Sequence, residues 1–165
     1  MPRHILIDGY NLAYASPGIR AALLADKQKG RERLIDLLRR YKKISGARIT
    51  VVFDSGEDSP REKDAPASGI TVIYSRPPLN ADEELRKMLN AASDRGNILL
   101  VSGDRAVAHS AKRRNIASIS SSEFLLKVQQ LLSQRGEAGE KPDTVDVGEW
   151  EAFFRITKDG DDSEK

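Results

Sequence analysis

Short runs rich in Ile, Leu and Val alternate with helix-like segments along most of this 165-residue chain. Continuous apolar strands of this kind are typical of a parallel sheet that helices cover on both faces. We therefore predict one α/β domain with a Rossmann-like sheet of about five parallel strands. The strands are expected at residues 3–8, 48–54, 70–74, 98–101 and 116–119.

Helical spacing of apolar residues predicts the segments between these strands. Gly9-Tyr10-Asn11 reads as a turn, and one helix is expected to follow the Pro17-Gly18 break and to continue to about Tyr41. Further helices are expected at 80–94, 104–114 and 121–135.

Acidic residues stand where the predicted strands end. Asp8 ends the first run, Asp54 ends the second, and Asp104 follows the fourth. Asp82 and Glu83 open the helix after the third strand. The C-terminal ends of parallel strands share one edge, and the strand order 3-2-1-4-5 brings these acids together there.

Such an edge predicts a metal centre. Carboxylate oxygens suit hard divalent ions, and Mg²⁺ or Mn²⁺ bound there can activate water and stabilise a phosphate during in-line displacement. The sequence has no cysteine, which excludes thiolate metal sites and cysteine nucleophiles.

Each acid also has a purely structural interpretation. Asp8 precedes Gly9, as a turn residue does, and Asp104 is placed to cap the helix that follows it. Asn80 and Glu83 have the spacing of a capping box, whereas Asp82 would favour the positive end of the same helix. None of these interpretations explains why the acids gather at one edge.

Charge divides the chain into two parts. The segment 136–165 has ten Asp and Glu against four Lys and Arg, which leaves 15 acidic and 23 basic residues in 1–135. We predict a nuclease-like domain over 1–135 and an acidic C-terminal extension over 136–165. Within the extension, 149–156 is expected to dock on the domain through Trp150 and its apolar neighbours, and the end is expected to be disordered.

A basic body with an acidic centre suits a polyanion bound around metal ions, although a solvated surface would have a similar composition. Candidate contacts to such a polyanion near the acidic edge are Arg76, Arg105, Arg61, Lys63 and Tyr10. No run is long enough to span a membrane and no signal-peptide pattern opens the chain, so we expect a cytoplasmic protein.

Four motifs in this order resemble the NYN domain family, specifically its YacP-like branch among the PIN-like nucleases. They lie at residues 5–12, 51–54, 80–83 and 100–104, and the resemblance covers about 3–135. The resemblance implies a PIN-like sheet, dependence on Mg²⁺ or Mn²⁺, and endonucleolytic cleavage of RNA, with a ribosome or RNA-processing assembly as a further partner.

Carried over by position, the resemblance makes the four aspartates Asp8, Asp54, Asp82 and Asp104 catalytic metal ligands, with Glu83 as an addition. Asn11 and Ser102 match polar positions that support them, although Asn11 can also be a turn residue. One departure from the family pattern is Gly103, which stands between Ser102 and Asp104 where a hydroxyl residue often precedes the last acid directly.

Two other functions stay open. A non-catalytic RNA- or ribosome-binding module would retain the fold without cleaving RNA. The departure at Gly103 from the family pattern is compatible with this alternative. A phosphatase with Asp8 as nucleophile would want a second aspartate two residues later, where Tyr10 stands.

Overall fold

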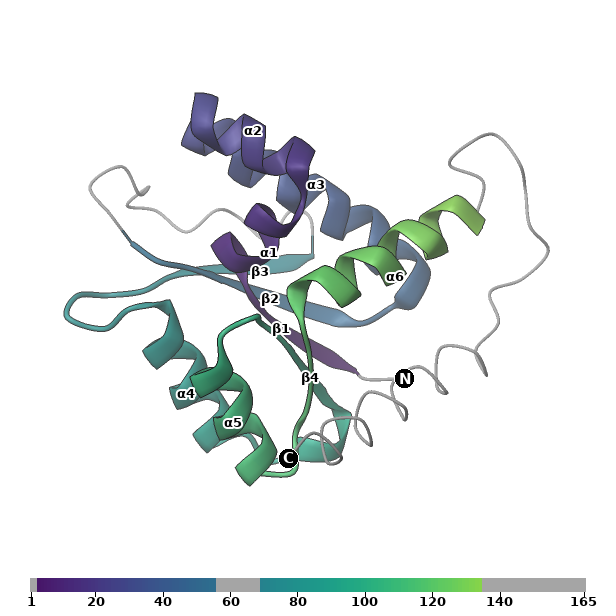
Figure 1. Ribbon diagram of the computed structural model, residues 1–165. Coiled ribbons are helices and arrows are strands. Elements are labelled where there is room, and N and C mark those ends of the chain that lie inside the picture. The colour runs from purple at the N-terminus through teal and green to yellow at the C-terminus, as the bar shows by residue number, and fades with distance from the viewer. Residues whose placement is uncertain (1–2, 56–68, 135–165) are drawn as a thin grey trace.

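The computed structural model describes residues 3–55 and 69–134, and five strands in this part of the chain form one parallel sheet (Figure 1). Its order is β3-β2-β1-β4-β5, which confirms the predicted fold. The strands are β1 (His4–Asp8), β2 (Arg48–Phe53), β3 (Ile70–Tyr74), β4 (Ile98–Val101) and β5 (Ala117–Ile119). The expected C-terminal extension, with its docking segment at 149–156, lies outside the described residues.

The strands are buried on both faces, and successive side chains enter different cores. Ile5 and Ile7 of β1 belong to the larger core, whereas Leu6 between them belongs to the smaller one. In β2, Val51 and Val52 divide in the same way. This alternation explains why the strands read as continuous apolar runs.

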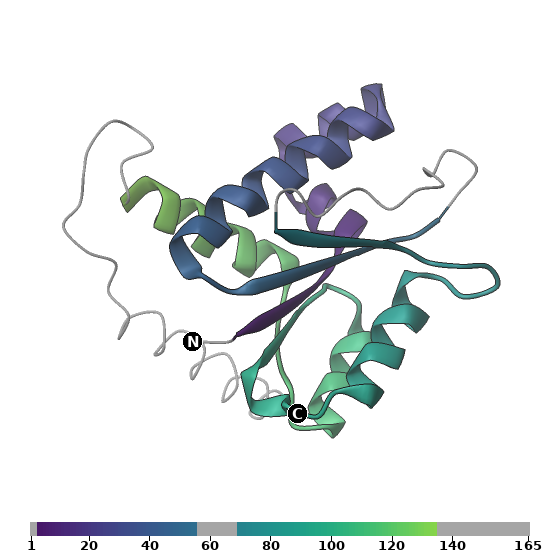
Figure 2. The ribbon, with the colours of Figure 1, turned by 180° about the vertical axis from the view of Figure 1, so that it is seen from behind.

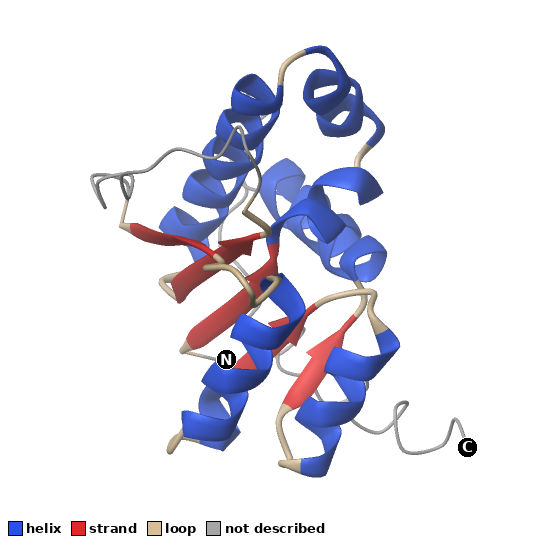
Figure 3. Cartoon of the chain, turned by 90° about the vertical axis from the view of Figure 1, so that its left-hand side faces the viewer, coloured by secondary structure: helices blue, strands red, loops and turns tan. Residues whose placement is uncertain are grey.

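Two layers of helices enclose the sheet, as Figures 2 and 3 show from behind and from the side. Helices α1, α2, α3 and α6 cover the face with the larger core, and α4 and α5 cover the other. Their bounds are α1 (Gly9–Ala15), α2 (Pro17–Ala25), α3 (Lys27–Ser45), α4 (Ala81–Ala91), α5 (Arg105–Arg113) and α6 (Ser121–Gln134), with a 3₁₀ turn, η2 (Arg95–Asn97), before β4. None of the helices in the described ranges is long and apolar enough to cross a membrane.

The segment between β1 and β2 differs from the sequence prediction. The predicted turn at 9–11 is the start of helix α1, and the single helix expected up to Tyr41 is divided into α2 and α3. Pro17 opens α2 because the first helical position needs no N–H donor, and Ser16 caps that helix. Asp26 caps α3 by accepting a hydrogen bond from the backbone N–H of Lys29 at 3.2 Å.

The capping signals at the other helices are confirmed. Asn80 and Glu83 form a reciprocal capping box at α4, with 2.9 Å for each of the two hydrogen bonds. The Asp104 carboxylate caps α5 by accepting from Ala106 N–H at 2.8 Å and from Val107 N–H at 3.1 Å. Each cap fixes a helix start at the edge of the sheet where the strands end.

Gly30 allows α2 and α3 to pack closely. A Cβ atom at this position would lie 2.5 Å from Leu23 Cγ and 2.7 Å from its backbone Cα, which cannot move aside. At Gly18 of α2, by contrast, a Cβ atom would meet nothing within 4 Å.

We predict that Gly30→Ala lowers the free energy of unfolding by about 1–3 kcal/mol, because the overpacking outweighs the better helix propensity of alanine. Gly18→Ala, the matched control, should be neutral or stabilise by up to about 1 kcal/mol. Urea unfolding followed by circular dichroism measures both variants. Equal stability of the two variants would contradict the close packing.

Candidate metal centre

Asp8 is the most deeply placed of the predicted acids. It ends β1, its side chain is 9% exposed, and the Ser102 hydroxyl donates a hydrogen bond to Asp8 Oδ2 at 3.3 Å. Burial raises the pKa of Asp8 above its ordinary value, and the charges of Asp104 and Asp54 add to this, against hydrogen bonds from Asn11 N–H and Ser102. A buried carboxylate among like charges favours a nearby cation.

Asp104 lies across the β1–β4 pair from Asp8. Its backbone N–H donates to Ser102 Oγ at 3.0 Å, so that one serine hydroxyl contacts both acidic residues. Partial burial disfavours ionisation, but the N–H groups of Val107 and Ala106, a hydrogen bond from Asp82 and the charge of Arg86 hold the pKa of Asp104 below its ordinary value. The positive end of α5 therefore keeps this carboxylate ionised.

Asp82, in the first turn of α4, lies beside Asp104, to which its carboxyl can donate a hydrogen bond when it is protonated. Burial, this hydrogen bond and the negative charges of Asp104 and Asp8 raise the pKa of Asp82 to about 6, against the opposing charge of Arg86. Asp82 is thus the member of the pair that keeps a proton, since Asp104 has the stronger hydrogen-bond donors. Binding of a divalent cation by these carboxylates would displace that proton.

Asp54 holds the β3–α4 connection to the end of β2. Its Oδ1 accepts from Ala81 N–H at 3.1 Å and from the Ser75 hydroxyl at 3.3 Å. The start of α4 is therefore tied to the strand that lies beside β1, which brings Asp82 toward Asp8.

A pocket of about 290 Å³ opens at this edge of the sheet. Three of the four predicted aspartates line it, together with side chains of α1 and of the α4 start: Asp8, Tyr10, Asn11, Tyr14, Asp54, Asn80, Ala81 and Asp82. Asp104 does not line the pocket, but it lies beside Asp82, which does. Glu83 is occupied by the capping box and does not line the pocket.

Asn11 joins three segments behind the pocket. Its Oδ1 accepts from Gly103 N–H at 2.8 Å and from the Ser121 hydroxyl at 2.5 Å, which links α1 to the β4–α5 loop and to α6. A Cβ atom at Gly103 would lie 3.0 Å from Asn11 Oδ1. The glycine that departs from the family pattern therefore gives Asn11 the space to hold this loop, and Asp104 still caps α5.

The donor set fits a hard divalent ion, although the carboxylates do not close around one point. Among the residues that the structure describes, no three acidic or histidine side chains form a group able to hold a metal together. Mg²⁺ is usually held by one or two carboxylates, with water and substrate phosphate completing its shell. Asp8 with Asp54, or Asp82 with Asp104, meets that requirement.

The predicted RNA contacts are only partly brought to this edge. Tyr10 lines the acidic pocket, and Arg76 is exposed on the β3–α4 connection. Arg105 lies in a groove between α4 and α5, whereas Arg61 and Lys63 lie outside the described residues.

Sequence reasoning missed three contacts at this edge. Ser75 holds Asp54, Ser121 holds Asn11, and the contact of Arg31 with Tyr10 was not foreseen, although Arg31 belongs to a basic helix face that the sequence offers as an extension of the RNA track. No motif or spacing marks these contacts, because each acts across a long sequence separation.

Comparisons with known proteins identify the family and the fold of the chain. The sequence model of YacP-like NYN domains matches residues 5–149 of the chain. The "Uncharacterized protein YacP" of Bacillus subtilis (strain 168) is 29% identical over 90 residues, which are 54% of this chain and 53% of that protein. The matched part thus spans about half of the curated relative's length.

Two crystal structures of Rae1 (YacP) from Bacillus subtilis have a similar fold. One, of a mutant, superposes with a TM-score of 0.66 at 24% identity and covers 82% of this chain and 79% of its own. The other has a TM-score of 0.65 at 22% identity, with 97% and 95% covered. At these identities the likeness establishes the arrangement of strands and helices.

We predict that the acidic edge destabilises the metal-free protein as the pH rises. Folded Asp82 keeps its proton up to pH about 6, whereas an unfolded aspartate loses it near pH 4, so stability falls between these values. Asp82→Asn should therefore match the wild type near pH 4 and be more stable at pH 8, by about 1 kcal/mol or less after solvent screening. Denaturant unfolding in EDTA measures the difference.

Asp36→Asn is the matched control, because Asp36 pairs with Arg39 and Arg40 on the exposed side of α3. Loss of the Asp36 charge should leave the free energy of unfolding at pH 8 unchanged or slightly lower. A gain at pH 8 in both variants, or in neither, would contradict the prediction for Asp82.

Proposed function

This chain belongs to the family of YacP-like NYN domains, which has a PIN-like nuclease fold, and we propose that it is a metal-dependent endoribonuclease. One observation carries the proposal. Aspartates from separate segments meet at one edge of the sheet, where the Asp82 and Asp104 side chains lie beside each other and three of the four line one pocket. Like charges so close together are costly in the absence of a cation, which favours a metal centre over a purely structural role.

We assign Asp8, Asp54, Asp82 and Asp104 as the residues that would hold Mg²⁺ or Mn²⁺. Such an ion supplies an activated water and neutralises charge on the phosphate under attack. Ser102 orients Asp8 and the Asp104 backbone, and Asn11 holds the loop between them. Hydrolysis of this type would leave a 3′-hydroxyl and a 5′-phosphate.

A basic groove between α4 and α5 provides a path for RNA away from the acidic pocket. It has a volume of about 440 Å³, and its lining includes Arg86, Arg105, His109 and Arg113. The part of the chain that the structure describes places no carboxylate within ion-pair distance of these arginines. Arg86 also acts on the charges of Asp82 and Asp104, so the groove begins beside the acids.

A non-catalytic RNA- or ribosome-binding module is the second candidate function. It is favoured by the absence, within the described ranges, of any three acids that already form a metal-binding group. In either case we expect RNA as the ligand and the cytoplasm as the location.

We predict that Asp8→Asn lowers cleavage of end-labelled single-stranded RNA by about a hundredfold or more in Mn²⁺ or Mg²⁺, because it removes a ligand charge. EDTA should abolish cleavage by the wild type. Asp94→Asn, a matched control in the exposed turn before β4, should cleave normally.

Three outcomes separate the candidate functions. Loss of cleavage in both Asp8→Asn and EDTA supports the endoribonuclease. Equal cleavage by the wild type and Asp8→Asn would contradict it. Binding without cleavage in either metal would favour the binding module.

We further predict that Arg105→Gln/Arg113→Gln weakens RNA binding and lowers the logarithmic salt slope of binding by about 1.4, since each of two phosphate contacts on a single strand contributes about 0.7. Arg3→Gln/Arg95→Gln removes the same charge from exposed residues at the opposite edge of the sheet. Fluorescence anisotropy at several salt concentrations measures both. Equal salt slopes for the groove variant and the control variant would contradict a role of the groove in RNA binding.

A further inference from the structure

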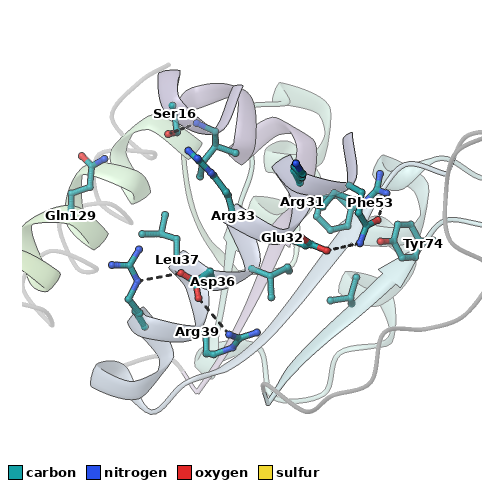
Figure 4. A pocket seen from close by; sticks show the side chains of 17 residues that line it. Ser16, Arg31, Glu32, Arg33, Asp36, Leu37, Arg39, Phe53, Tyr74 and Gln129 are labelled. Atoms are coloured by element: carbon teal, nitrogen blue, oxygen red, sulfur yellow. Dashed lines mark hydrogen bonds and ion pairs between the residues drawn. The ribbon is translucent and has the colours of Figure 1, made fainter. Parts of the chain in front are cut away.

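Arg31 is a buried cation with neutral partners. Its side chain, on α3, is 4% exposed and lies beside Phe53 and Tyr74 (Figure 4). The guanidinium donates to the Tyr10 hydroxyl at 2.9 Å and to Gln28 Oε1 at 2.7 Å, and its Nε is buried without a hydrogen-bond partner. Buried arginines are normally paired with a carboxylate, because an uncompensated charge away from water is costly.

The surroundings of Arg31 only partly compensate this charge. The nearest described acid in its network is Glu32, which receives a hydrogen bond from Gln28 at 3.0 Å and so meets Arg31 only through a neutral amide. The ring of Tyr74, 5.9 Å from the guanidinium, adds a modest cation–π attraction. The described part of the chain thus holds a positive charge that an anionic ligand would neutralise.

Tyr10 places this charge next to the acidic pocket. Its side chain lines that pocket together with Asp8 and Asp54, while its hydroxyl contacts Arg31 on the α3 side. The exposed Lys27 ammonium lies 5.7 Å from the centre of the Tyr10 ring and adds a second cation. The basic side calls for an anionic group, and a divalent ion held by the aspartates would call for a second, as two adjacent phosphates of an RNA strand supply.

The chemistry of the pair suits a phosphate. Arginine is the preferred side chain for phosphate, since its guanidinium offers several donors in a fixed fork. The Tyr10 hydroxyl accepts from Arg31 and therefore retains its own proton to donate to a phosphate oxygen. Tyr14, which is 47% exposed and lines the same pocket, offers a ring face on which an unpaired base can stack.

We propose that Arg31, Tyr10 and Lys27 form a phosphate subsite on the α3 side of the acidic pocket. It binds a phosphate of single-stranded RNA adjacent to the one that faces the carboxylates. This inference rests on the proposed function for the identity of the ligand, but binding at the subsite needs neither metal nor cleavage.

The test is binding of a fluorescent single-stranded oligoribonucleotide in EDTA, with Asp8→Asn as the parent protein so that no cleavage occurs. Adding Arg31→Met should weaken binding about tenfold or more and reduce the logarithmic salt slope by about 0.7, the contribution of one phosphate. Arg31→Lys should restore part of the slope but not the full affinity. Arg95→Gln, which removes one exposed charge at the opposite edge, should change affinity less than twofold.

Thermal unfolding separates this role from a structural one. An apolar side chain in place of a buried, unpaired cation should keep or raise the unfolding temperature, so weaker binding at unchanged stability supports the subsite. If Arg31→Met does not fold, Tyr10→Phe and the exposed Lys27→Gln carry the test, and each should weaken binding about threefold or more. Binding and salt slope unchanged in all variants that fold would overturn the proposal.

Two further experiments identify the ligand and distinguish failure of the subsite from failure of the nuclease proposal. Inorganic phosphate should compete with the oligoribonucleotide only at much higher concentration, whereas equal competition would mean that the subsite takes free phosphate and not RNA. Arg31-dependent binding by a wild type that never cleaves would keep the subsite and contradict the nuclease. Cleavage by the wild type together with binding that does not depend on Arg31 would support the nuclease and contradict the subsite.

Discussion

The parallel pairing of β1 with both β2 and β4 is the constraint on which the rest of the structure depends. It places the end of β1 between two neighbouring strand ends, so that Asp8 meets Ser102 from β4 and lies beside the connection that Asp54 holds after β2. Because all five strands run in one direction, every helix that follows a strand starts at the same edge. Both core layers and the acidic pocket are consequences of this arrangement.

The acidic edge is held together by polar contacts that offset its own repulsion. The Ser102 hydroxyl contacts both Asp8 and Asp104, the start of α5 stabilises the Asp104 carboxylate, and Asp82 binds a proton below about pH 6. Asn11 ties the loop of Gly103 to two helices on the other side of the sheet. The fold thus holds the acidic residues at one edge of the sheet, and an ordinary helix cap orients the Asp104 carboxylate.

Positive charge borders the acidic pocket on two sides. Arg86 opens the groove between α4 and α5, and Arg31 stands behind Tyr10 on the side of α3. An RNA strand that crosses the pocket would meet cations before and after the acids. This arrangement of charge suits a row of phosphates better than a single small anion. The proposed nuclease centre and the proposed subsite would thus contact neighbouring phosphates of one RNA strand.

The sequence alone determined the strands, their class of sheet and the caps at Asn80 and Asp104, since these depend on residues a few positions apart. It placed three of the acids at or just after strand ends and Asp82 at a helix start, but it predicted a turn at 9–11, because nothing local shows that Gly9 begins a helix packed against Phe53. The roles of Asn11, Ser121 and Arg31 were decided only by the tertiary structure. Their contacts join residues 21 to 110 positions apart, and no local pattern encodes a contact over such a separation.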